Sequence, residues 1–141
     1  MTDINVISTA YQVERRSWYL GTPDNPGFIQ SVTLDVSAFN AAHYPNGYIP
    51  SGTILAILAS GGKAVPYLDA GTGGAGVAKG ILFSAVKIPN LADLTKDVGA
   101  AMLVAFAPVS ESKLPFTSST VSGGFIDANG KGELPLIYWA A

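Results

Sequence analysis

The chain has 141 residues, of which 48% are hydrophobic and only 13% are charged, about half the charged share of an ordinary soluble domain. A formal net charge of −2 argues against general binding to nucleic acid or anionic membranes, and the apolar content excludes a disordered chain. The length predicts one domain, and we expect a partner to cover part of its poorly charged surface.

The sequence contains no cysteine, which excludes disulfide bonds and thiolate metal sites. The first residues, Met1–Ile4, lack the basic and apolar regions of a signal peptide, so we expect none. The longest apolar stretches, Ile54–Ala59 and Ala100–Val109, are too short to cross a bilayer. We therefore expect no membrane partner.

Residues 1–30 differ from the rest of the chain and end in a turn-forming stretch, Gly21–Phe28. We interpret residues 1–30 as an extended N-terminal arm and residues 31–141 as a single β-rich domain. The alternative is that the arm packs on its own domain as a first strand. Deletion of residues 2–20 distinguishes the two, because the loss of an arm should leave the melting temperature nearly unchanged.

Strand-forming residues in an arm without a partner strand suggest addition to a sheet edge of another protein. The predicted anchors are Trp18 and Tyr19, with Arg15 and Arg16 pairing with carboxylates at the rim. Trp, Tyr and Arg are the residue types that dominate protein interfaces.

Short runs of β-branched and aromatic residues between glycines and prolines predict strands in the rest of the chain. The expected strands are Gln30–Phe39, Ile49–Ser60, Ala64–Asp69, Val77–Val86, Met102–Val109 and the end of Asp127–Trp139. The stretch Ala41–Tyr48 predicts a turn. One or two short helices are expected, at a turn capped by Asn90 and within Thr117–Gly124. The start of the last segment, at Asp127, predicts a β-turn.

Gly71, Gly73 and Gly76 match the G-x-G-x-x-G pattern of dinucleotide-binding loops. That pattern requires a helix directly after the loop, whereas the β-branched residues that follow predict a strand. A phosphate-binding P-loop fails as well, because Lys79 does not follow a glycine directly and precedes no Ser or Thr. We therefore expect a surface loop and no bound cofactor.

Side chains that could carry catalysis are sparse. His43 is the single histidine, and its neighbours Tyr44 and Pro45 favour a turn residue over a general base. The ten acidic residues are dispersed along the chain. Asp127 and Asn129 faintly resemble the start of a calcium loop, but the later glutamate is missing. The sequence predicts neither a catalytic set nor a metal site.

Several short motifs occur in a distinctive order. An Ile-Pro-x-Gly-Thr-x-Leu strand at Ile49–Leu55 precedes a Gly-Lys pair at Gly62-Lys63, an aromatic-Asp segment at Tyr67–Asp69 and a Gly-Ile-Leu strand at Gly80–Leu82. With VSESKLPF and FIDANGKGELPLIYW further on, this order resembles the phage lambda-type head decoration proteins, which cement the capsid. The resemblance covers residues 49–139. The family often carries an Asp-Gly pair and more acids in the loop, whereas this loop has no acid.

The resemblance implies a β-clip-like fold, a bent ribbon or incomplete barrel. It also implies a homotrimer that binds the major capsid protein at threefold or quasi-threefold positions and stabilises the outer surface of a tailed-phage icosahedral capsid. Such a protein is made in the host cytoplasm and is not an enzyme. The candidate trimer or capsid surface consists of Tyr44, Tyr48, Pro50 and Tyr67.

Two other classes of function stay open. A virion accessory module could bind a carbohydrate or host receptor through Tyr44, Tyr48 and Tyr67. A β-clip nucleotide hydrolase of the dUTPase type would need a magnesium-binding acid and a nucleoside-binding strand, and we identify neither in the sequence.

Overall fold

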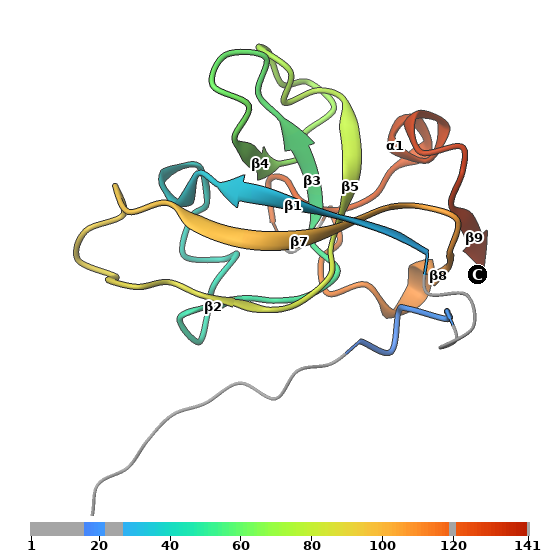
Figure 1. Cartoon of the computed structure of the whole chain (residues 1–141), viewed down its shortest axis with the longest axis horizontal. Coiled ribbons are helices and arrows are strands. Elements are labelled where there is room, and N and C mark those ends of the chain that lie inside the picture. Colours follow the sequence, from blue (N-terminus) through green and yellow to red (C-terminus); the bar gives the residue numbers. More distant parts are fainter. Residues whose placement is uncertain (1–15, 22–26, 119–120, 141) are drawn as a thin grey trace, which may run out of the picture.

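The computed structural model describes residues 16–21, 27–118 and 121–140, and its centre is a closed barrel of five strands in the order β1-β4-β3-β5-β7 (Figure 1). The strands are Phe28–Leu34 (β1), Tyr48–Ile49 (β2), Ile54–Ile57 (β3), Ala64–Pro66 (β4), Ala78–Leu82 (β5), Val86–Lys87 (β6), Val98–Ala105 (β7), Pro108–Ser110 (β8) and Tyr138–Ala140 (β9). The helical segments are the 3₁₀ turns Val36–Ala38 (η1) and Glu111–Lys113 (η2) and the α-helix Ala128–Glu133 (α1). The predicted fold class, mainly β and barrel-like with short helices, is confirmed.

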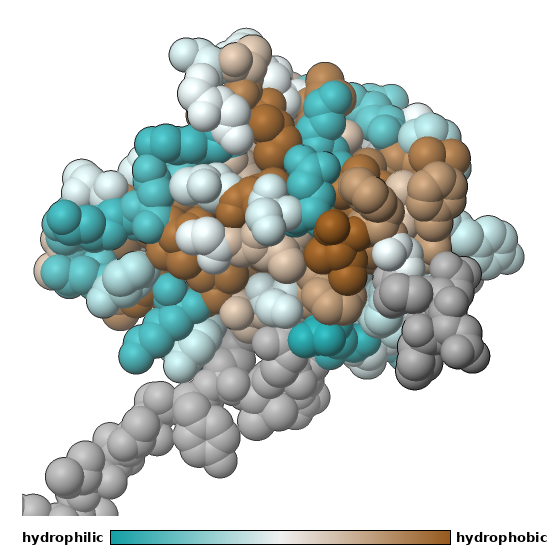
Figure 2. Space-filling model, in the orientation of Figure 1, coloured by the Kyte–Doolittle hydropathy of each residue, from teal (hydrophilic) through white to brown (hydrophobic). Residues whose placement is uncertain are grey.

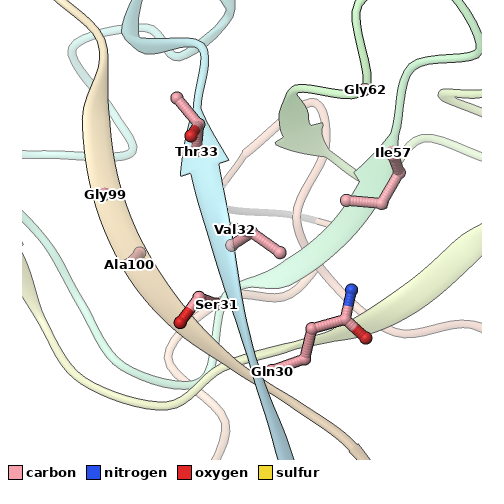
Figure 3. A pocket seen from close by; sticks show the side chains of 8 residues that line it. All are labelled: Gln30, Ser31, Val32, Thr33, Ile57, Gly62, Gly99 and Ala100. Atoms are coloured by element: carbon pink, nitrogen blue, oxygen red, sulfur yellow. The ribbon is translucent and has the colours of Figure 1, made fainter.

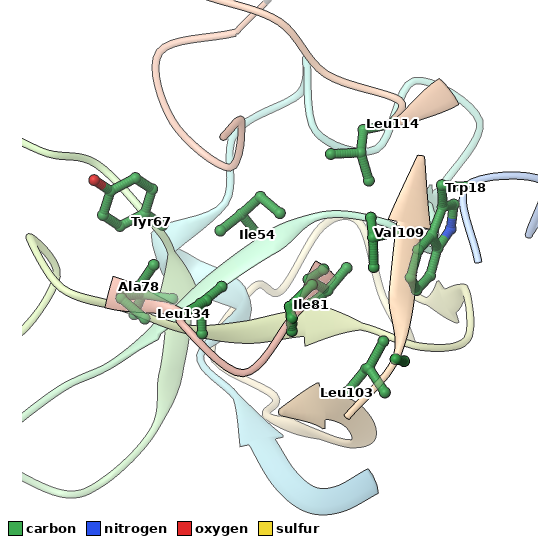
Figure 4. Packing of buried hydrophobic residues seen from close by; sticks show 13 residues of the cluster. Trp18, Ile54, Tyr67, Ala78, Ile81, Leu103, Val109, Leu114 and Leu134 are labelled. Carbon is green, nitrogen blue, oxygen red and sulfur yellow. The ribbon is translucent and has the colours of Figure 1, made fainter. Parts of the chain in front are cut away.

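Strand β3 lies between β4 and β5 in the barrel and pairs antiparallel with both. Successive side chains of a strand point to opposite faces. Ile54 and Ala56 therefore pack into one apolar cluster, which also holds Ile81 and Leu103 (Figure 4), and Leu55 packs into a second cluster on the other face. Because both faces of β3 are covered, its sequence is a continuous apolar run and does not alternate.

The two aliphatic segments on either side of the glycine loop pair with each other, with Ile54 opposite Ile81 and Leu55 opposite Gly80. The strand expected after the glycines is thus confirmed as β5. A side chain at Gly80 would place its Cβ 2.5 Å from Cγ of Met102 and 2.7 Å from the carbonyl oxygen of Leu103. The glycine therefore lets β5 lie closely against β7.

Two small sheets flank the barrel. Strands β2 and β6 pair antiparallel, and β8 and β9 pair parallel. Part of the segment expected as one long strand, Ile49–Ser60, thus divides between β2 and β3. Likewise, the segment Met102–Val109 divides between β7 and β8, because the chain turns at Phe106. No helix in the described ranges is long and apolar enough to cross a membrane.

Four local predictions are wrong, and at three of these places a polar side chain bonds to nearby groups. The strand expected over Gln30–Phe39 ends at Leu34, and the Ser37 hydroxyl donates to the Asp35 carboxylate at 2.6 Å. The side chain of Asn90 accepts the N–H of Ala92 (2.9 Å) in a turn that does not become a helix.

The third correction concerns the turn predicted at Asp127, which is the start of helix α1. The Asp127 carboxylate accepts the N–H of Gly130 at 2.7 Å and so caps the helix. The glycines at 130 and 132 disfavour a helix, which is why the sequence indicated a turn. No helix is present in the described part of Thr117–Gly124.

The described part of the predicted arm belongs to the domain. Trp18 is only 1% exposed and is a member of the first core cluster, and its indole N–H donates to Ser51 Oγ at 3.3 Å. Its carbonyl accepts the N–H of Ser110 (2.7 Å), and Tyr19 pairs antiparallel with Val109. The arm interpretation is therefore wrong for residues 16–21, which pack on β8, while residues 1–15 lie outside the described ranges.

We expect substitution of Trp18 by alanine to lower the free energy of unfolding by about 3–5 kcal/mol, because it empties a large buried site. Urea denaturation of the purified protein measures this loss. Tyr138→Ala is the control, because Tyr138 is 72% exposed and should change stability little. Deletion of residues 2–20 should likewise destabilise the fold. A Trp18→Ala protein as stable as the wild type would contradict the packing described here.

Candidate functional site

The residues predicted to anchor a partner make contacts within the chain instead. The Arg16 guanidinium lies 4.4 Å from the centre of the Phe83 ring, and the Tyr19 ring meets the same ring edge-on at 5.2 Å between centroids. Together with Trp18 they form an aromatic contact on the barrel. Arg15 lies outside the described ranges, so the structure does not test its predicted role.

The four residues predicted for a trimer or capsid surface do not form one surface of exposed side chains. Tyr67 is 1% exposed and lies in the first core cluster, so its assignment to a surface is wrong. Tyr44 and Tyr48 are partly buried, and Tyr44 packs against the second cluster. Pro50 is also partly buried, and its carbonyl accepts the Thr53 hydroxyl at 2.8 Å.

Tyr67 connects the end of β4 to helix α1. Its hydroxyl donates to Oδ1 of Asp127 at 2.9 Å, the same oxygen that caps the helix. Asn129 donates to the two carboxylate oxygens of Asp69, each at 3.0 Å, on the adjacent loop. Burial raises the pKa of the Tyr67 hydroxyl, and its bond to Asp127 raises the pKa further. A phenol held protonated in this way acts as a fixed hydrogen-bond donor, which is a structural role.

His43 is buried, and both of its ring nitrogens are bonded. Its Nδ1 accepts the N–H of Asn40 at 3.1 Å, so Nε2 carries the proton and donates to the carbonyl of Gly123 at 2.8 Å. Burial lowers the pKa of the imidazole. With the rings of Phe39 and Phe116 packed edge-on against it, His43 holds two loops together as a neutral side chain.

The glycine loop folds back on β3 and is closed by its own turns. The Ala75 N–H donates to Thr72, and the carbonyl of Gly73 accepts the N–H of Ala59. Gly74 has φ +103°, and a Cβ there would lie 2.5 Å from the Ile57 carbonyl oxygen. Only glycine combines this conformation with so close an approach. The loop thus packs against one end of the antiparallel pair of β3 and β5, called here the β3–β5 ribbon. A strand, not a helix, follows the loop.

Within the described ranges, no group of three or more histidine or acidic side chains is placed to hold a metal ion. The described residues with the most exposed aromatic and aliphatic side chains point to a different kind of site. Four of them, defined here as the apolar patch, come from the ends of β1 and β7 and from the segment that leads into β9: Phe28, Phe106, Leu136 and Tyr138.

Backbone contacts place these four residues near one another. Phe28 pairs with Ala105, the N–H of Phe106 donates to the carbonyl of Leu136 (2.9 Å), and that of Tyr138 donates to Ala107 (3.2 Å). In Figure 2, brown apolar surface lies beside the right-hand ends of β1 and β7, and the surface where Figure 1 places β9 is paler. The side chains are 53%, 59%, 56% and 72% exposed, in chain order.

Phe106 has φ +62°, in the left-handed region, and it is the one non-glycine residue with positive φ in the described ranges. Such a conformation costs on the order of 1–2 kcal/mol for a residue with a bulky side chain. Strain of this kind at an exposed aromatic side chain suggests a role on the surface. Sequence reasoning did not predict the exposure of these side chains, because Phe106 and Tyr138 both lie in segments that are typical of strands.

None of the protein-family models, curated proteins or solved structures compared with the chain matches it. The candidate site is therefore defined by geometry alone, as an exposed apolar patch.

We expect a pH dependence of stability that comes from His43. Because its folded-state pKa is lowered, neutral His43 stabilises the fold fully above the unfolded pKa of about 6.5, and this contribution is lost as the pH falls below that value. Urea denaturation from about pH 7.5 to about pH 5 should show a steeper loss for the wild type than for His43→Gln. Equal slopes would contradict the prediction, since the other titrating groups are common to both proteins.

Tyr67→Phe and Asp127→Ala should each lower the free energy of unfolding by about 1–2 kcal/mol, and the double variant should lose less than the sum. The reason is that one oxygen of Asp127 joins the phenol to the helix cap. A double-mutant cycle in urea measures the coupling. Strictly additive losses would show that the two residues act independently.

Proposed function

We propose that this chain is a structural virion protein that binds the outer surface of a tailed-phage icosahedral capsid and stabilises it as a homotrimer at threefold or quasi-threefold positions. Its partners are the major capsid protein and further copies of itself. The observation that carries the proposal is the apolar patch on a chain with few charges.

The size of the apolar patch supports contact with a protein. Phe and Tyr side chains bury about 150–250 Å² each, so four residues that are more than half exposed present on the order of 400 Å². Exposed patches of about 300–600 Å² are often functional. A stable interface buries about 800 Å² on each partner, so the apolar patch would supply its central half.

The choice of a capsid as the partner rests on the motif order over residues 49–139. The Ile-Pro-x-Gly-Thr-x-Leu segment contributes Ile54 and Leu55 to the two core clusters, and the Gly-Ile-Leu segment contributes Ile81. The first motif thus runs from β2 into β3, and the second lies in β5, which pairs with β3. The apolar patch lies at the end of β7, which pairs with β5, at the start of β1, and around the start of β9.

We expect the protein to bind purified expanded heads that lack it, with density at threefold positions in electron micrographs. The double variant Phe106→Gly, Tyr138→Ser should bind at least about tenfold more weakly, because it removes two aromatic anchors. Glycine is favoured at the φ of Phe106, so the variant should fold as well as the wild type.

Leu91→Ser is the matched control, since Leu91 is also 59% exposed but does not belong to the apolar patch. Absence of density on heads, or density at fivefold vertices alone, would contradict the proposal. Saturable binding of a nucleotide or a carbohydrate in the absence of head binding would favour the other classes of function.

A further inference from the structure

The barrel is closed unevenly on the two sides of β1. On one side β1 pairs antiparallel with β7 from Phe28 to Leu34. On the other side, within the described ranges, it pairs with β4 at a single position, Leu34 opposite Ala64. Along Phe28–Thr33, one edge of β1 therefore has no neighbouring strand in the part of the chain that the structure describes.

The pairing identifies which main-chain groups face this edge. The N–H of Asp35 donates to the carbonyl of Ala64 at 2.9 Å, on the β4 side. Backbone groups of a strand alternate in direction with a period of two residues, and the β1–β7 register is regular from Ile29 onward. The N–H groups of Thr33, Ser31 and Ile29 therefore point toward the β4 side, and those of Val32 and Gln30 point toward β7.

A groove lies beside the unpaired edge. It has a volume of about 580 Å³ and extends across β1: Gln30 to Thr33 of β1 line it, with Gly99 and Ala100 of β7 on the paired side and with Ile57 of β3 and Gly62 of the β3–β4 turn across the unpaired edge. Figure 3 shows the side chains of Gln30 and Ile57 extending into the space between β1 and β3. No charged residue lines the groove. An occupant would therefore meet uncharged side chains and the main-chain groups of β1.

We propose that the groove accepts an extended, uncharged segment of the capsid protein, of about five residues, as an additional strand along β1. The spacing of the groups selects this occupant, because donors repeat about every 6.8 Å along an edge and only another extended backbone matches them. Unpaired sheet edges are templates for strand addition. This inference rests on the proposed function for the identity of the partner. None of the four residues of the apolar patch lines the groove, although Phe28 lies at the start of the same strand.

The position of Ser31 allows a sharp test. Ser31→Pro removes one N–H that faces the groove and leaves the bonds to β7 in place, as a proline on an edge strand does. We expect its thermal stability to stay near that of the wild type and its binding to heads to fall more than tenfold. Ser31→Ala keeps the N–H and should bind as the wild type does. Val32→Pro removes an N–H that faces β7 and should destabilise the fold.

Hydrogen exchange measured by NMR tests the same edge without a substitution. In the free protein, the N–H groups of Ile29 and Ser31 should exchange quickly, while those of Gln30 and Val32 are protected by β7. Exchange is then carried out while the protein is bound to heads, and the signals are recorded after its release. The N–H groups of Ile29 and Ser31 should exchange at least tenfold more slowly on heads than in the free protein. Protection of these N–H groups in the free protein would overturn the proposal. If the protection does not depend on protein concentration, the occupant of the groove is another part of the same chain. If it rises with concentration, the occupant is a second copy of the chain.

A capped peptide of alternating Thr and Val, five residues long, separates this inference from the proposed function. At millimolar concentration it should shift the amide signals of Ile29 and of residue 31 in the wild type and in Ser31→Ala, but leave the Ile29 signal unchanged in Ser31→Pro, which has no N–H at position 31. Head binding with no protection at Ile29 and Ser31 would overturn the inference and leave the proposed function standing. Peptide binding at this edge with no binding to heads would overturn the proposed function and leave strand addition at β1 standing. No response to either probe would overturn both.

Discussion

Both faces of strand β3 must be covered at once, because Ile54, Leu55 and Ala56 are fully buried. One face requires the cluster that Trp18, β8 and the region around α1 complete, and the other requires β1, η1 and the β2–β6 pair. These segments are too short to be stable alone, since isolated two-stranded ribbons are marginal in water. The positions of the flanking elements therefore depend on the strand between them.

The same constraint explains how the N-terminal segment comes to lie on the barrel. The first core cluster needs a large apolar side chain at the end where β8 and Pro115 lie. The Trp18 side chain fills that space and packs against Gly52. The segment gains backbone bonds to Pro108 and Ser110 as well. An aromatic residue that is well suited to an interface with another protein is equally well suited to an interface with its own domain.

Polar side chains inside the molecule hold loops, whereas the surfaces proposed for contact are nearly uncharged. His43 and Tyr67 each join two segments that are distant in sequence, and each does so in its neutral form. By contrast, Phe106 keeps an unfavourable backbone conformation while exposing its ring. Rigid interior bonds and an exposed, strained aromatic residue are the combination expected where a fixed scaffold presents a contact surface.

The sequence by itself determined the class of fold and the approximate positions of β3 and β5, because short apolar runs bounded by turn residues are local signals. It could not determine which aromatic side chains are exposed. Trp18 and Tyr67 are buried and Phe106 and Tyr138 are not, although all four are similar in local pattern. Helix α1 was hidden for the same reason, since its cap depends on Tyr67, which is distant in sequence. Only the tertiary structure decides such cases, because burial is a property of neighbours that lie far apart along the chain.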